Sequence, residues 1–166
     1  MTTAVPLPQG DLALLEHDVA QELLHKDIPA RLAYVAADGT PRVLPMNFWW
    51  NGTEVVMATF TGAAKVPALR RHPAVALTID TVSDKPHVLQ IRGEAVITDV
   101  DGIVEEYELM MRRGMPAEVA DGYFADLRAS GARMHRIAVI PAWAGVLDFQ
   151  TRFPGAAPAA LTDRPD

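Results

Sequence analysis

Apolar residues recur along parts of this chain with the spacing of one helical face. From residue 11 to about residue 25 the leucines and valines follow that spacing, with Asp11 placed to cap the first turn and Pro29 lying beyond the end. A shorter helix is expected where Pro67 can occupy a first turn, in which a missing backbone N–H is tolerated. The pattern predicts helices over residues 11–25, 62–72, 101–113 and 116–128.

Elsewhere the apolar residues form shorter runs, rich in Val, Ile and Leu, that are typical of β-strands. The pairs Asp38-Gly39 and Asn51-Gly52 separate the first three runs, and such pairs supply the positive φ angles of tight hairpins. Pro141 interrupts the last run and indicates a sheet edge, a bulge or a bend. The predicted strands cover residues 30–37, 41–50, 53–60, 74–81, 87–98 and 134–149. About six mainly antiparallel strands with two or three flanking helices predict an α+β domain or small β-barrel.

Length and composition narrow the class of protein. The 166 residues, 49% hydrophobic and 22% charged, are enough for one domain with a buried core. We expect that domain to span residues 11–153, between flexible tails at 1–10 and 154–166. With 21 acidic and 15 basic residues the net charge is -6, which argues against non-specific binding of nucleic acid.

Several kinds of chemistry are excluded by what the chain lacks. No stretch approaches the ~20 apolar residues of a membrane span, and the N-terminus has no signal-peptide pattern, so we expect a cytoplasmic protein. The absence of cysteine excludes a thiolate ligand or nucleophile. The 5 histidines show no spacing typical of a metal site, and there is no G-x-S-x-G motif for a nucleophilic serine.

The segment from Thr59 to Lys65 carries residues suited to binding a phosphate. It joins a predicted strand to a predicted helix and combines hydroxyl groups, small residues, backbone N–H groups and one ammonium. Only three of the 15 basic residues are lysines, so a lysine at this position stands out. The alternative interpretation is that Thr59 and Thr61 are ordinary strand residues and that Lys65 is a surface charge.

Two other segments are candidates for contact with a planar ligand. The strand from Arg42 to Asn47 carries Pro45 in its middle, which is tolerated only at a sheet edge or bulge, and an open edge leaves backbone groups free for the edges of a ring. On a later strand, Gln90 and Arg92 share one face. The alternative is that the proline merely marks an edge and that the Gln90 face is solvated.

Taken in order, these motifs resemble those of the pyridoxamine 5'-phosphate oxidase-related flavin-binding family, whose fold is a split β-barrel. The motifs are a strand with Arg42 and Met46, an Asn-Gly hairpin, a strand ending in threonine, Lys65-x-x-x-Leu-x-x-x-Pro, and Gln-x-Arg-Gly-x-Ala from Gln90. The likeness covers residues 30–98 well and the C-terminal third only in outline.

The resemblance implies a homodimer that holds FMN, or in some branches a deazaflavin such as coenzyme F-420, in a groove between subunits. Thr59 and Lys65 would then hold the phosphate, and Gln90 would hydrogen-bond near the flavin ring. The implied cofactor-binding residues are Arg42, Val43, Leu44, Pro45, Met46, Asn47, Ala58, Thr59, Thr61, Lys65, Gln90, Trp143 and Phe149.

Two departures from the family pattern shape the expected function. Ala64 precedes Lys65 where the FMN oxidases often carry a second basic residue, and the histidine-containing pattern near the C-terminus is replaced by Thr151 to Pro154. The resemblance therefore implies an FMN-dependent oxidoreductase acting on a small organic substrate rather than on vitamin B6. A deazaflavin-dependent reductase and a flavin-binding or flavin-sensing protein without turnover are the alternatives.

Overall fold

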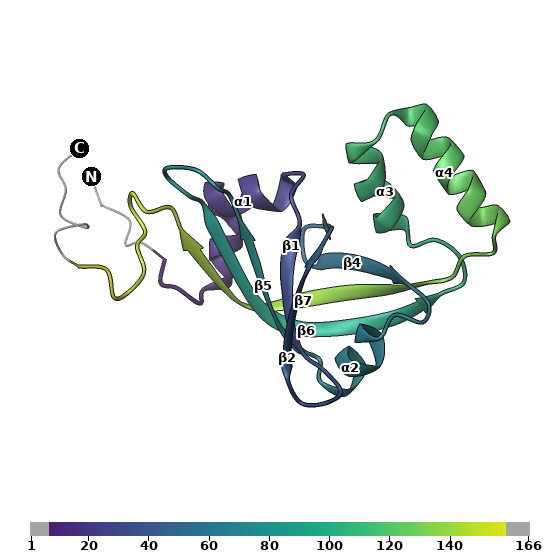
Figure 1. Ribbon diagram of the computed structural model, residues 1–166. Helices are drawn as coiled ribbons and strands as arrows, with labels where there is room; N and C mark the ends of the chain where they lie inside the picture. The colour runs from purple at the N-terminus through teal and green to yellow at the C-terminus, as the bar shows by residue number, and fades with distance from the viewer. Residues whose placement is uncertain (1–6, 159–166) are drawn as a thin grey trace.

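Figure 1 shows the computed structural model, which describes residues 7–158. Within these residues the centre is a seven-stranded antiparallel sheet with the order β2-β1-β5-β6-β7-β4-β3. The strands are β1 (Ala30–Val35), β2 (Pro41–Met46), β3 (Trp49–Trp50), β4 (Val55–Phe60), β5 (Ala74–Asp80), β6 (Val88–Val100) and β7 (Met134–Leu147). The helices are a 3-10 helix (Leu12–Glu16), α1 (Asp18–His25), α2 (Lys65–Arg71), α3 (Glu105–Gly114) and α4 (Ala117–Ala129).

The order of the strands shows that the sheet curls into a barrel. β2 and β3 lie at its opposite edges, yet only Asn47 and Phe48 separate them in the chain. A link this short spans only about 10 Å, so the two edges of the sheet must approach each other. Among the described residues β2 pairs only with β1 and β3 only with β4, so the barrel is split between β2 and β3. The predicted α+β split β-barrel is confirmed.

The curling also explains a difference from the sequence prediction. The sequence predicts one strand over residues 41–50, whereas the chain leaves β1 and joins β4 within this stretch and so forms two strands. The predicted hairpin at Asn51 is present: its side-chain oxygen accepts hydrogen bonds from the backbone N–H groups of Thr53 (3.0 Å) and Glu54 (2.7 Å). The described chain therefore has seven strands rather than about six, and its four α-helices correspond to the four helical ranges that the pattern predicts.

A β-bulge interrupts the longest pair of strands, β6 and β7. Their register shifts between Arg92 and Gly93, opposite which Ala142 is the extra residue. Pro141 lies at this shift, so of the edge, bulge or bend that the sequence predicts, the structure shows a bulge. A Cβ added at Gly93 would lie 2.0 Å from the carbonyl oxygen of Ile140, so the approach of the two backbones requires glycine here.

The helices pack on different parts of the sheet. The first predicted helix is divided at His17, whose Nδ1 accepts a hydrogen bond from the N–H of Val19 (3.2 Å) and caps α1. α1 packs on β3, β5 and β6, and α2 packs on β1 and β6, with Leu69 in the barrel core. α3 and α4 form a hairpin that projects from the sheet in Figure 1, in which α3 contacts β3 and β4 and α4 packs on α3.

Residues near the N-terminal end of the described chain lie along β7. Gln9 forms two hydrogen bonds with the backbone of Val146 (2.7 and 2.9 Å), and the N–H of Gly10 donates to the carbonyl of Ala144 (2.8 Å). Residues 1–6 and 159–166, which belong to the predicted tails, lie outside the described residues. Within residues 7–158, no helix combines the length and the apolar character that crossing a membrane requires.

Candidate functional site

A row of polar side chains ends the barrel core near α2. On the inner face, two apolar rows cross β6, β7 and β4: Ala95, Val139 and Val55, then Ile97, Ile137 and Met57. The next row in the same register is Asp99, His135 and Thr59. Because every second residue of a strand faces the same side, these three polar side chains lie on the core side of the sheet. We call them the mouth row.

A histidine and an arginine share the carboxylate of the mouth row. Nδ1 of His135 lies 2.5 Å from Oδ1 of Asp99, and Nη2 of Arg70, from α2, donates to the same oxygen at 2.5 Å. The His135 side chain is only 11% exposed. The hydrogen bond from His135 lowers the pKa of Asp99 most, and the hydrogen bond from Arg70 lowers it further. The ionised carboxylate therefore orients the imidazole and ties α2 to this end of the barrel.

Lys65, the first residue of α2, carries a half-buried ammonium. Burial lowers the pKa of Lys65, and no carboxylate among residues 7–158 pairs with it. A partly desolvated cation without a counter-ion gains free energy when an anion binds beside it. Because α2 has only 7 residues, we attribute the anion-binding potential to side chains rather than to the helix dipole.

The two threonines predicted beside this lysine differ in their contacts. Thr61 donates through both its backbone N–H and its hydroxyl to the carbonyl of Arg133, at 3.0 Å each. Thr59 is half-buried, and its hydroxyl makes no hydrogen bond within the described residues. Ala58 faces the opposite side of β4, where it pairs in register with Arg136. Thr59 is therefore the hydroxyl of this segment whose proton is available to a ligand.

The segment 42–47 makes up most of β2, which is an edge strand, as Pro45 predicts. Its side chains alternate between two faces. Val43 and Pro45 are exposed on the outer face, whereas Leu44 and Met46 are half-buried on the core side. The six side chains therefore cannot all meet one ligand, although backbone groups along the open edge can.

The two ends of this segment are both exposed. Arg42 pairs with the carboxylate of Asp38 in the β1–β2 turn (2.8 Å), and Asn47 lies in the link to β3. Arg42 is thus engaged within its own hairpin.

Gln90 and Trp143 lie together on the outer face of β6 and β7. Gln90 pairs in register with Gly145, and Arg92 pairs with Trp143. The guanidinium of Arg92 lies 4.1 Å from the centroid of the Trp143 ring, a cation–π contact. At the rise of a β-strand, the nine-residue separation of Gln90 from Asp99 along β6 corresponds to about 30 Å, so the outer pair is remote from the mouth row of the same chain.

Phe149 lies beyond the end of β7 in a turn built on a buried carboxylate. Asp148 accepts hydrogen bonds from the backbone N–H groups of Gln150, Thr151 and Arg152 (2.8, 2.8 and 2.7 Å) and from the Thr151 hydroxyl (2.6 Å). Burial would raise the pKa of Asp148, but these bonds outweigh it and lower the pKa to about 2. The turn holds Phe149 at φ 56°, in the left-handed region, beyond the end of β7 where Val88 pairs with Leu147.

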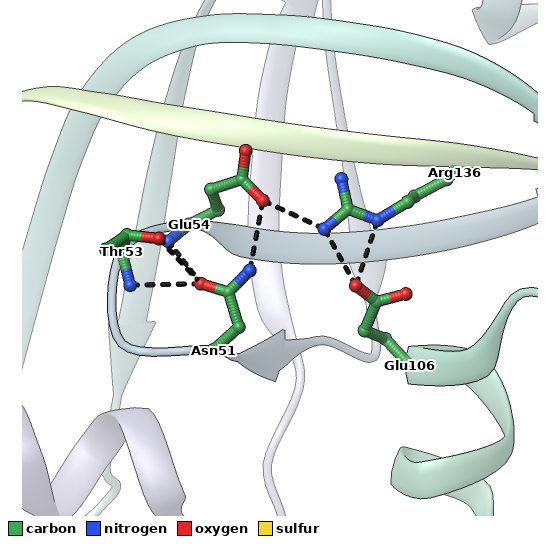
Figure 2. Close-up of polar contacts among 5 residues, drawn as sticks. All are labelled: Asn51, Thr53, Glu54, Glu106 and Arg136. Carbon is green, nitrogen blue, oxygen red and sulfur yellow. Dashed lines mark hydrogen bonds and ion pairs between the residues drawn. The ribbon is translucent and has the colours of Figure 1, made fainter.

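A second polar cluster, drawn in Figure 2, fixes α3 to the barrel. Arg136 of β7 donates to Glu106 of α3 at 2.9 and 2.7 Å and to Glu54 at 2.8 Å. Nδ2 of Asn51 also donates to Glu54 (3.0 Å). The hydrogen bond from Arg136, and to a smaller extent that from Asn51, lowers the pKa of Glu54. Each side chain of this cluster has at least one partner within the chain, so we assign the cluster a structural role.

In one chain, the structure thus brings Thr59 and Lys65 to the same end of the barrel, and it adds two residues that the sequence analysis missed. These are His135, which the sequence shows only as one of 5 histidines without metal-site spacing, and Asp99, which no sequence motif indicates. The signal that could have found them is alternation: both share parity with apolar core residues of their strands. No group of three or more His, Asp or Glu that could hold a metal is present within residues 7–158.

Fold and site together define an α+β split-barrel protein with a polar, partly cationic corner at one end of the barrel. A family model described as pyridoxamine 5'-phosphate oxidase matches residues 17–140. The chain therefore belongs to the pyridoxamine 5'-phosphate oxidase family, and the resemblance seen in the sequence is confirmed. No curated protein sequence matches the chain.

Solved structures with the same fold include an F420 reductase, which is 26% identical, has a TM-score of 0.55 and is matched over 75% of this chain and 94% of that one. A protein from Clostridium acetobutylicum related to general stress protein 26 of the pyridoxinephosphate oxidase family is 15% identical, with a TM-score of 0.56 over 82% and 88% of the two chains. The conserved hypothetical protein Rv2991 from Mycobacterium tuberculosis is 16% identical, with a TM-score of 0.58 over 87% and 90%. The last two similarities concern the fold alone.

Proposed function

We propose that the protein is an oxidoreductase that binds FMN, with the phosphate at Lys65 and Thr59, and acts on a small organic substrate. The observation that carries this proposal is the half-buried Lys65 ammonium, which has no counter-ion among residues 7–158. When bound, the flavin would supply the hydride or electron transfer, and the protein would supply position and electrostatics. Membership of the pyridoxamine 5'-phosphate oxidase family supports the same assignment.

The residues around Lys65 fit a phosphate group. The ammonium offers positive charge, and the hydroxyl of Thr59 offers a donor. Between them in the chain, Gly62 has φ +90°, and a Cβ added there would meet no atom within 4 Å, so the turn that precedes Lys65 is open to solvent at this glycine. Partial burial of Lys65 strengthens its attraction to an anion because fewer water molecules screen it.

A deazaflavin is the second candidate cofactor, and two observations favour it. The F420 reductase that shares this fold is 26% identical to the chain. The corner also holds one lysine without a basic neighbour, because residue 64 is alanine. Coenzyme F-420 carries its phosphate as a singly charged diester, whereas the monoester of FMN carries about two charges, so a single lysine matches the diester better.

We further propose that two copies of the chain complete the site. The roughly 30 Å between Gln90 and the mouth row is too long for one flavin-sized ligand, so Gln90 and Trp143 would serve the neighbouring copy. The outer face of β2, β1, β5 and β6 offers a surface for this pairing: Val43 is 67% exposed on it, beside an alanine-rich groove of about 500 Å³. Exposed apolar patches of this kind commonly mark interfaces.

The phosphate assignment is tested by a lysine substitution. We expect Lys65→Ala to weaken FMN or F-420 binding about 10- to 100-fold, because a charge-assisted contact is lost, while thermal unfolding changes little. Lys85→Ala is the matched control, since Lys85 is an exposed lysine bonded to Gln150 in a distant loop. Fluorescence titration measures both affinities, and equal binding by wild type and Lys65→Ala would contradict the assignment.

The identity of the cofactor and the catalytic turnover of the protein need separate measurements. Mass spectrometry of the cofactor released from the purified protein distinguishes FMN from a deazaflavin. Bleaching of the bound cofactor by NADH, NADPH or a reduced substrate, followed by absorbance, is the result expected of an oxidoreductase. A cofactor that binds tightly but is reduced by no donor would instead indicate a binding or sensing role.

A further inference from the structure

The proposed phosphate site at Lys65 and Thr59, which we call the anion corner, lacks one positive charge for a phosphate monoester. Such a group carries about -1.5 to -2 at neutral pH, whereas Lys65 supplies one charge and Ala64 none. The mouth row contains a titratable group next to the same corner. His135 stands directly opposite Thr59 in the register of β4 and β7, and side chains of such directly opposed pairs have Cβ atoms about 5 Å apart.

The contacts of His135 leave one of its ring nitrogens for a ligand. Nδ1 lies 2.5 Å from the ionised Asp99, so this nitrogen carries a proton. Nε2 makes no hydrogen bond within the described residues. In the neutral ring Nε2 presents a lone pair, which repels a phosphate oxygen; in the protonated ring it carries a proton and donates to one.

We propose that His135, in its protonated form, is a further anion-binding residue that supplies the second charge of the phosphate site. This inference rests on the proposed function. Asp99 acts as a positioning residue, because it fixes the ring and stabilises its positive charge. Binding of a phosphate monoester then takes up a proton, and affinity falls as the pH rises and His135 becomes neutral.

The other charged groups that face His135 do not produce the same pH dependence. Asp99 of β6 has a lowered pKa, because His135 and Arg70 donate hydrogen bonds to it, and so stays ionised at neutral and alkaline pH; Arg70 of α2 is paired with the same carboxylate. Lys65 of α2 is present in both wild type and the His135 variants, so its contribution cancels in the comparison. The difference between them therefore reports the imidazole.

The test is titration with FMN at pH 7.0, 7.75 and 8.5, where the phosphate is already a dianion. We expect the affinity of wild type to fall roughly tenfold more over this range than that of His135→Gln. His135→Lys carries a permanent charge and should bind FMN more tightly than wild type at pH 8.5. His25→Gln, an exposed histidine at the end of α1, is the control and should behave as wild type.

Two further readouts separate this inference from the proposed function. Calorimetry in buffers of different ionisation enthalpy should show greater proton uptake when wild type binds FMN at pH 7.75 than when His135→Gln does. Riboflavin, which lacks the phosphate, should bind wild type and variant alike. If His135→Gln keeps the affinity and pH dependence of wild type while Lys65→Ala weakens binding, the role of His135 is overturned and the proposed function stands. If no variant or wild type binds FMN, both are overturned.

Discussion

A single glycine makes the bulge between β6 and β7 sterically feasible. We expect Gly93→Ala to destabilise the fold by at least ~1–3 kcal/mol, because the new Cβ would overlap backbone atoms of Ile140 that cannot rotate away. Urea denaturation followed by circular dichroism measures this loss. Gly122→Ala is the control: Gly122 lies inside α4 with no atom within 4 Å of an added Cβ, so alanine should stabilise by up to ~1 kcal/mol. Equal stabilities of wild type and Gly93→Ala would refute the requirement for glycine.

Residues of the site differ in how far the sequence could predict them. Lys65 is identifiable because its surroundings, a strand end followed by small residues, are local in the chain. His135 and Asp99 are not, since their meeting depends on the register of two strands that the α3–α4 hairpin separates in the chain. A shift of one residue would place both on the other face. The local pattern therefore indicates the proposed phosphate site at Lys65, but not the neighbouring pair of His135 and Asp99.

At the scale of elements, α3 is attached to the barrel through Arg136. We expect Arg136→Met to cost roughly 1–3 kcal/mol, because Glu106 and Glu54 would lose a partly buried partner. The loss should be local: hydrogen exchange of α3 and α4 amides should accelerate, while strands β5 and β6 remain protected. Arg133→Met removes a highly exposed pair with Asp101 and should change exchange little. Uniform acceleration across all elements with Arg136→Met would show instead that the cluster stabilises the whole barrel.

The sequence predicted the boundaries of elements correctly where local turn residues determine them. The prediction was wrong where pairing between distant strands determines them. The hairpins at Gly39 and Gly52 both have the positive φ that their sequences predict. The stretch 41–50 reads as one strand because its residues favour extended structure throughout, yet curling of the sheet transfers it from one edge to the other. Similarly, the spacing over 11–25 is helical, but His17 caps a new helix in its middle.

At the scale of the whole molecule, the proposed site requires that two chains associate through the outer face. Arg92 and Glu94 lie there on β6, and neither has an ion-pair partner within residues 7–158, so a two-fold axis crossing β6 would set each opposite its complement in the other copy. The exposed Val43, from β2 at the sheet edge, would be buried beside this contact. An apolar face with two complementary charges favours pairing with itself over exposure to water.

We therefore expect Val43→Glu to convert a dimer to a monomer, because a buried, unpaired carboxylate would oppose association. Sedimentation velocity measures the oligomeric state, and flavin titration of the same samples should show weakened binding, since Gln90 and Trp143 of the neighbouring copy would be lost. Val119→Glu is the control, because Val119 is an exposed valine on α4, away from the sheet face. It should leave the oligomeric state and the flavin affinity unchanged. A monomeric wild type that binds flavin with full affinity would show that one chain suffices, and would reassign Gln90 and Trp143 to structural roles.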